Sequence, residues 1–164
     1  MARCSHTLES LDVTYDLCRT SIRICAHAKN LILFPVGLES ASFNLSKATK
    51  LRDAVFRPES EGIEYTTTTL QTITPELREL RQITIYVPYY LTRYKVGTDI
   101  RQSLGEAAFR RWSALDRILV QFWESRSIRP RVGCAILVEI GQNVEYCIGC
   151  LFPEITKRGI VDPV

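Results

Sequence analysis

The chain has 164 residues, a hydrophobic share of 46%, a charged share of 24% and a formal net charge of +3. This length suits one domain with a single core, and the composition is that of a globular rather than a disordered chain. The small net charge argues against a nucleic-acid partner, whose binding surface normally carries a clustered basic stripe. We therefore expect one globular domain over residues 1–164.

Neither a secretory signal nor a membrane-spanning segment is indicated. The N-terminal segment, MARCSHTLES, lacks a basic and then apolar run, and no apolar stretch approaches the roughly 20 residues of a membrane-spanning helix. The 6 cysteines are irregularly spaced and too sparse for a disulfide-built domain. These features predict a cytoplasmic or nuclear protein with mostly reduced thiols and no membrane partner.

Two elements are predicted in the first half of the chain. The apolar run at residues 31–34 stops at Pro35 and indicates a strand. In residues 63–74, Ile63, Thr67, Leu70 and Ile73 fit one face of a helix behind a Ser60 cap. The consecutive threonines in this segment favour extended structure instead, but the helical spacing is the stronger signal.

Two strands are predicted in the second half. Residues 83–87, with sequence ITIYV, are rich in β-branched side chains and stop at Pro88, so they form the clearest strand pattern in the chain. Residues 131–140 are apolar almost throughout and lie between Pro130 and Gly141. Such a run suits a parallel strand that is buried on both faces.

A long amphipathic helix is predicted between these strands, at about residues 98–127. Its start has two candidate caps, Ser103 with Glu106 and Asp99 with Gln102, while Gly105 weakens the first turn. Glu106 and Arg110 form a favourable i,i+4 pair. The helix is indicated by an apolar stripe at helical spacing, made of Leu104, Ala108, Trp112, Leu115, Leu119 and Phe122.

An internal echo is the most informative pattern. The segments LRDAVFRP at residues 51–58 and LRQITIYVP at residues 80–88 share a leucine, an arginine and alternating apolar residues, and both run into proline. The echo begins at Leu51 in the first segment and at Leu80 in the second. A looser similarity relates the triplet PEL at residues 75–77 to the triplet PEI at residues 153–155. The spacing from Leu51 to Leu80 is typical of leucine-rich repeats, in which strands stack side by side and a helix connects each strand to the next.

The segments LSKATKLRDAVFRP and LRELRQITIYVP resemble the irregular leucine-rich-repeat regions that follow F-boxes in many fungal proteins. The resemblance spans about residues 30–140, but the N-terminus shows no F-box motif, so a ligase-adaptor role is not indicated. It implies an α/β fold with leucine-rich-repeat-like layers of parallel strands and helices, either whole or a piece of a longer array. It also implies a scaffold that binds another protein. The alternative fold is a compact two-layer α/β or α+β domain.

A tyrosine-rich segment is the best candidate for the binding surface. Tyrosine side chains offer rigid contact area with a polar tip, and they are enriched at protein interfaces. The alternative is that these rings cover the edge of the domain's own core. The candidate residues straddle the end of the 83–87 strand and the loop that follows, and they are Tyr86, Tyr89, Tyr90, Arg93, Tyr94 and Lys95.

The pair Cys147 and Cys150 forms a CxxC motif, which is the alternative functional site. It would be a redox dithiol if it opened a helix after a strand, where the helix dipole lowers the thiol pKa. Zinc is an alternative for the same pair, but a structural zinc site needs four ligands. Cys4 with His6 and Cys25 with His27 are candidate ligands, which would form a Cys₂His₂ site of unfamiliar spacing.

The sequence contains no recognisable catalytic set. Its 2 histidines, His6 and His27, both lie near the N-terminus. It has no GxSxG elbow, phosphate-binding loop, dinucleotide-binding glycine motif or HExxH motif. The scattered carboxylates, such as Glu64, Asp116 and Glu139, do not form a pair. We therefore expect a non-enzymatic protein that needs no cofactor.

Overall fold

The computed structural model describes residues 2–3, 9–16, 21–27, 43–46, 48–58, 62–128, 130–134, 142–160 and 162–163. The predicted strand at 31–34 lies outside these residues, as do Ser60, Cys4, His6 and residues 135–140. The elements in chain order are β1 (Ala2–Arg3), β2 (Ser10–Asp16), β3 (Ser21–His27), β4 (Phe43–Asn44), β5 (Asp53–Arg57), α1 (Gly62–Gln71), β6 (Gln82–Val87), the 3₁₀ helix η2 (Tyr89–Arg93), α2 (Ile100–Leu104), α3 (Glu106–Arg126), β7 (Pro130–Cys134), α4 (Gln142–Leu151), α5 (Pro153–Lys157) and β8 (Asp162–Pro163).

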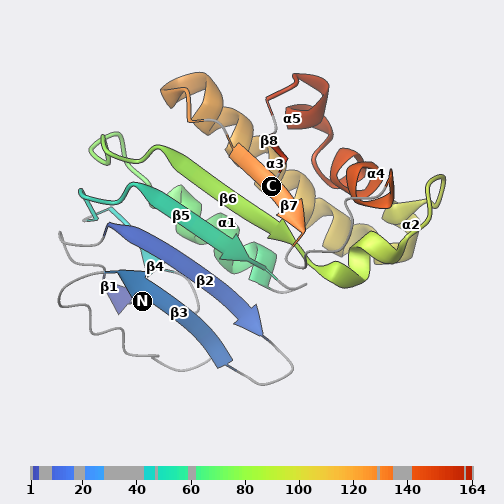
Figure 1. Cartoon of the computed structure of the whole chain (residues 1–164), viewed down its shortest axis with the longest axis horizontal. Coiled ribbons are helices and arrows are strands. Elements are labelled where there is room, and N and C mark those ends of the chain that lie inside the picture. Colours follow the sequence, from blue (N-terminus) through green and yellow to red (C-terminus); the bar gives the residue numbers. More distant parts are fainter. Residues whose placement is uncertain are drawn as a thin grey trace.

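A six-stranded sheet organises the fold, with strand order β3-β2-β5-β6-β7-β8 (Figure 1). β2 and β3 pair antiparallel, and every other neighbouring pair in this sheet is parallel. From β5 to β8, each strand lies beside the next strand in the chain. β1 and β4 form a separate two-stranded parallel sheet.

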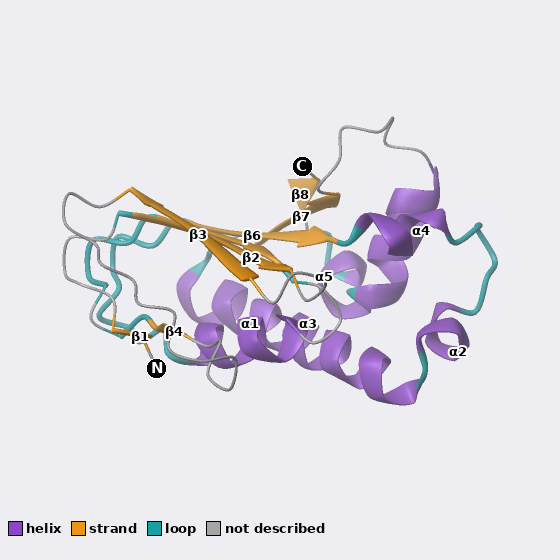
Figure 2. Cartoon of the chain, turned by 90° about the horizontal axis from the view of Figure 1, so that it is seen from below, coloured by secondary structure: helices purple, strands orange, loops and turns teal. Residues whose placement is uncertain are grey.

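The main helical layer lies on one face of the sheet. Figure 2 shows α1 and α3 along one face of the six-stranded sheet, with α5 on the same side. Right-handed crossover connections produce this arrangement when each new parallel strand is added at the same edge of the sheet, because the connecting helices then all pack on one face. No described helix lies over the opposite face. The protein is thus a mixed α/β fold of two layers, in agreement with the compact α/β alternative.

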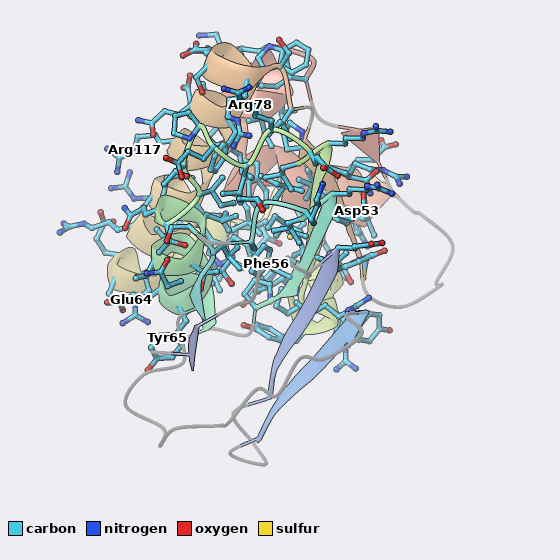
Figure 3. The ribbon with its side chains drawn as sticks, turned by 90° about the vertical axis from the view of Figure 1, so that its left-hand side faces the viewer. Asp53, Phe56, Glu64, Tyr65, Arg78 and Arg117 are labelled. Atoms are coloured by element: carbon cyan, nitrogen blue, oxygen red, sulfur yellow. The ribbon has the colours of Figure 1, made fainter. Side chains whose placement is uncertain are left out.

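Alternating side chains of the strands face the two sides of the sheet. In β5, Ala54 and Phe56 are buried, whereas Asp53 is exposed and Arg57 is half-buried. Figure 3 shows Phe56 in the layer between β5 and α1, with Asp53 on the other side of the strand. The set that faces the helices also includes Ile83, Ile85, Val87 and Val132, all of which are fully buried.

The echo in the sequence coincides with the register between β5 and β6. Ala54 pairs with Ile83 and Phe56 with Ile85. The two residues of each pair are therefore separated along the chain by the same number of residues as Leu51 and Leu80. Both leucines are buried just ahead of their strands. The register of the two strands is therefore already present in the spacing of the echo.

One backbone hydrogen bond recurs just before the strands. The backbone N–H of Arg52 donates to the carbonyl oxygen of Glu9 at 2.8 Å, and the N–H of Arg81 donates to the carbonyl oxygen of Arg52 at 2.8 Å. The segments that lead into β2, β5 and β6 are thus joined in the same way.

The predicted strand at 83–87 is confirmed as β6, and the predicted helix at 63–74 is confirmed as α1. The strand predicted at 131–140 is β7 over its described part. Burial of β7 on both faces is not fully realised. Val132, which faces the helices, is fully buried, whereas Arg131 on the other face is half-buried.

The single helix predicted at 98–127 is wrong in one respect, because it is two helices. Gly105 separates α2 from α3 with a φ of 79°, a backbone conformation that L side chains rarely adopt. Asp99 caps α2 by accepting a hydrogen bond from the Gln102 backbone N–H at 3.0 Å. The predicted pair of Glu106 and Arg110 is present, with 3.1 Å between Oε1 and Nε.

The core lies between the sheet and α3. Trp112, Leu115, Leu119 and Phe122 of the predicted stripe are buried, and Leu104 packs against the same core from α2. The Trp112 ring meets the ring of Phe152, which precedes α5, edge to face with centroids 5.4 Å apart. This contact joins α3 to the C-terminal helices.

Candidate protein-binding surface

The face of the sheet opposite the helices carries mostly polar side chains. It is built from the alternate residues of β5, β6 and β7, whose register brings Val55, Thr84 and Arg131 side by side. Thr84 is buried within the sheet and accepts a hydrogen bond from the Gln82 side chain at 3.0 Å. Contacts between its own side chains therefore help to order this face.

The carboxyl ends of β5 and β6 hold an arginine against a tyrosine. The Arg57 guanidinium carbon lies 4.7 Å from the centroid of the Tyr86 ring. Both side chains are half-buried, and both lie on the face away from the helices. Such a cation–π contact restricts the freedom of both side chains.

A second arginine–tyrosine pair follows immediately in η2. The Arg93 guanidinium carbon lies 4.9 Å from the centroid of the Tyr89 ring, and the Thr92 hydroxyl donates to the Tyr89 carbonyl oxygen at 2.8 Å. Leu91 is fully buried, so it anchors this turn to the core. The anchored turn gives its outward side chains defined positions.

Tyr90 and Val96 are the large hydrophobic side chains that stay exposed among the described residues, at 44% and 56%. Both lie in the segment that follows β6. Two exposed apolar side chains in one short segment make that segment a candidate interaction site. Val96 was not among the residues predicted from the sequence.

The six predicted surface residues divide into two groups. Tyr94 packs partly against the core, which agrees with the alternative role for that ring. The others face outward to differing degrees: Tyr86 and Tyr89 are half-buried, and Tyr90, Arg93 and Lys95 are exposed. Arg57 was also missed, although in the first copy of the echo it occupies the position that Tyr86 holds in the second.

The CxxC pair lies in the second half of α4, not at the start of a helix. Cys147 is fully buried, and this burial raises its thiol pKa to about 12, with smaller contributions from the neighbouring Cys150 and Cys134. The helix N-terminus that would lower a thiol pKa is not adjacent to the pair. The position therefore lacks the feature that the redox hypothesis requires.

A metal site is not evident in the part of the chain that the structure describes. No group of three or more histidine, cysteine, aspartate or glutamate side chains is arranged there to hold an ion. Cys25 and His27 lie in β3, while Cys4 and His6 fall outside the described residues.

The buried carboxylate of Asp116 has a structural role. Asp116 lies on α3 and accepts hydrogen bonds from the backbone N–H groups of Glu154 at 2.9 Å and Ile155 at 3.2 Å. It thereby caps α5, whose own N-cap residue is Phe152. Burial raises the pKa of the Asp116 carboxyl, and the two hydrogen bonds partly oppose that rise.

A groove of about 230 Å³ lies between α1 and α3, in the helical layer. Its lining contains no ionisable side chain, so it offers no group for acid–base chemistry. The lining residues are Leu70, Gln71, Ile73, Ile118, Gln121, Phe122 and Ser125.

No protein-family model, curated protein or solved structure matches the chain. Over the described residues, no helix is both long enough and apolar enough to cross a membrane.

Proposed function

We propose that the chain is a non-enzymatic scaffold of leucine-rich-repeat-like type that binds another protein through the strand-end surface. This surface is defined as Arg57, Tyr86, Tyr89, Tyr90, Arg93, Lys95 and Val96. The observation that carries the proposal is that Tyr90 and Val96, the exposed large hydrophobics of the described chain, both belong to this one segment.

The repeat-like character is supported by the order of the strands. β5, β6, β7 and β8 lie side by side in chain order and run parallel, with the helices on one face. The recurring hydrogen bond from Arg52 to Glu9 and from Arg81 to Arg52 adds a second regularity. In a solenoid, each unit contacts mainly its neighbours, and one face stays available for binding.

The chemistry of the strand-end surface suits protein recognition. Tyrosine and arginine are enriched among the residues that contribute most to binding energy at protein interfaces. Here Tyr86 and Tyr89 each contact an arginine through the ring, so less side-chain freedom is lost when a partner binds. The buried Leu91 fixes the backbone beneath them.

The test compares proteins captured from native lysate by the wild-type chain and by a Tyr90→Ala, Val96→Ser variant. Arg117→Ala is the matched control, because Arg117 is exposed on α3 and its guanidinium donates to the Ser113 carbonyl oxygen of the same helix. We expect a specific partner to be lost from the double variant and retained by the control. Equal capture by all three chains would refute the proposed surface.

A further inference from the structure

The part of the strand-end surface that follows β6 carries positive charge without acidic residues nearby in sequence. Residues 83–98 contain Arg93 and Lys95 but no aspartate or glutamate. The whole chain has a net charge of only +3, so this segment is more basic than the average of the molecule.

Several cations elsewhere in the described chain are neutralised by carboxylates. Arg93 and Lys95, like the control residue Arg117, form no salt bridge with any described residue, and both are exposed. The neutralised examples are Lys50 and Arg52 with Glu79, Arg101 and Arg110 with Glu106, Arg111 with Glu64, and Arg158 with Glu124.

The nearest described acidic residues do not cancel this charge. Asp99 is used as the cap of α2, where its side chain accepts the Gln102 backbone N–H. Glu145 lies on α4, which contacts η2, but it forms no ion pair with Arg93 or Lys95 in the described part of the chain. Carboxylates from another molecule are therefore the complementary groups for these two cations.

The ring contact also orients Arg93 for such a ligand. A guanidinium that lies over a tyrosine ring keeps the N–H donors at its edge available, and those donors match the geometry of a carboxylate. Tyr90 and Val96 add exposed apolar area in the same segment of the chain. Apolar area favours a polypeptide over a nucleic acid, whose phosphates would need a broader basic stripe.

We propose that the strand-end surface binds an acidic peptide segment of its protein partner, with aspartate or glutamate side chains at Arg93 and Lys95 and an apolar side chain against Tyr90 and Val96. This inference rests on the proposed function and adds the chemical class of the partner. The contact with the Tyr89 ring orients the Arg93 guanidinium, and the apolar contact with the peptide adds to the binding affinity.

The experiment is a selection of random peptides displayed on phage against the full chain. The selected peptides are then measured against wild type, an Arg93→Glu, Lys95→Glu variant, the Tyr90→Ala, Val96→Ser variant and the control Arg117→Glu. We expect enrichment of acidic residues next to an apolar residue. Affinity should fall by about tenfold in the Arg93→Glu, Lys95→Glu variant and on raising the salt concentration to about 0.3 M, with no change in the control.

Two results separate the failure of this inference from failure of the proposed function. Neutral peptides that bind equally to wild type and to the Arg93→Glu, Lys95→Glu variant, yet lose affinity in the Tyr90→Ala, Val96→Ser variant, would overturn the acidic partner and keep the surface. Peptides unaffected by either variant would overturn both proposals. Tighter binding of a single-stranded oligonucleotide than of any peptide would also overturn the acidic-peptide inference.

Discussion

Arg57 on β5 lies over the ring of Tyr86 on β6, and the two residues are separated by the same offset as the paired residues of the two strands. The pair therefore joins equivalent positions of the two echoed segments. It links the repeat-like pattern of the sequence directly to the surface that we propose binds a partner.

A double-mutant cycle on Arg57→Ala and Tyr86→Leu tests this contact. We expect a coupling energy of about 0.5–1 kcal/mol in the free energy of unfolding, because a partly exposed cation–π pair contributes about that much. Urea denaturation of the two single variants and the double variant gives the value. Additive effects of the two substitutions would contradict a specific contact.

Asp116 should be important for stability although it lies on no candidate surface. Replacement by alanine leaves the backbone N–H groups of Glu154 and Ile155 without their acceptors, so we expect a loss of about 1–3 kcal/mol in the free energy of unfolding. Asp99→Ala is the matched control. It removes the cap of the short α2 and should cost no more than about 1 kcal/mol. A larger loss in the control than in Asp116→Ala would contradict this ranking.

The same carboxyl predicts a pH dependence. Because burial raises its pKa, the folded chain holds the Asp116 proton more tightly than the unfolded chain does. The stability from this group is therefore fully present below pH 3.8, the ordinary pKa, and it is lost as the pH rises through the raised value. Asp116→Asn lacks this titration. The difference in unfolding free energy, wild type minus variant, should decrease as the pH is raised from 3.8 to neutral. An increase over this range would contradict the prediction.

Cys147 should be chemically inert in the folded protein. With a pKa of about 12, only about one molecule in ten thousand carries its thiolate at pH 8. We expect iodoacetamide to modify Cys147 only after unfolding, as measured by mass spectrometry of the digested protein. Fast modification of the native chain, or zinc found by metal analysis, would favour the redox or zinc alternative instead.

Two glycines should respond oppositely to alanine. Gly105 has a φ of 79°, so Gly105→Ala should destabilise the protein by about 1–3 kcal/mol through backbone strain alone, since no atom lies within 4 Å of the added methyl group. Gly149 lies inside α4, and its added methyl would meet only the Thr156 Cγ2 atom at 4.0 Å. Gly149→Ala should therefore stabilise the protein by about 0.5–1 kcal/mol. Thermal unfolding of both variants tests the pair, and a shift of the same sign in both would contradict it.

Local patterns predicted the central elements well. The β-branched run before Pro88 marked β6, and the spacing of Leu51 and Leu80 contained the register of β5 against β6. The antiparallel pair of β2 and β3 was not predicted. The alternation of Leu11, Val13 and Tyr15 with polar residues is the signal that could have identified β2.

Other features depend on tertiary contacts. Two caps were possible for the long helix, and the sequence could not select Asp99 because the choice depends on Gly105 adopting a positive φ. The capping of α5 by Asp116 joins α3 to a helix far along the chain, so no local pattern contains it. The exposure of Val96 likewise follows from how the segment after η2 leaves the core.

Site-specific photocrosslinking tests the central claim most directly. A benzoylphenylalanine residue replaces Tyr90 in one chain and Arg117 in another, and each is irradiated in native lysate. We expect a discrete protein adduct from position 90 that is absent from position 117 and is suppressed by the Arg93→Glu, Lys95→Glu substitutions. The absence of an adduct at position 90, or the same adducts at both positions, would contradict it.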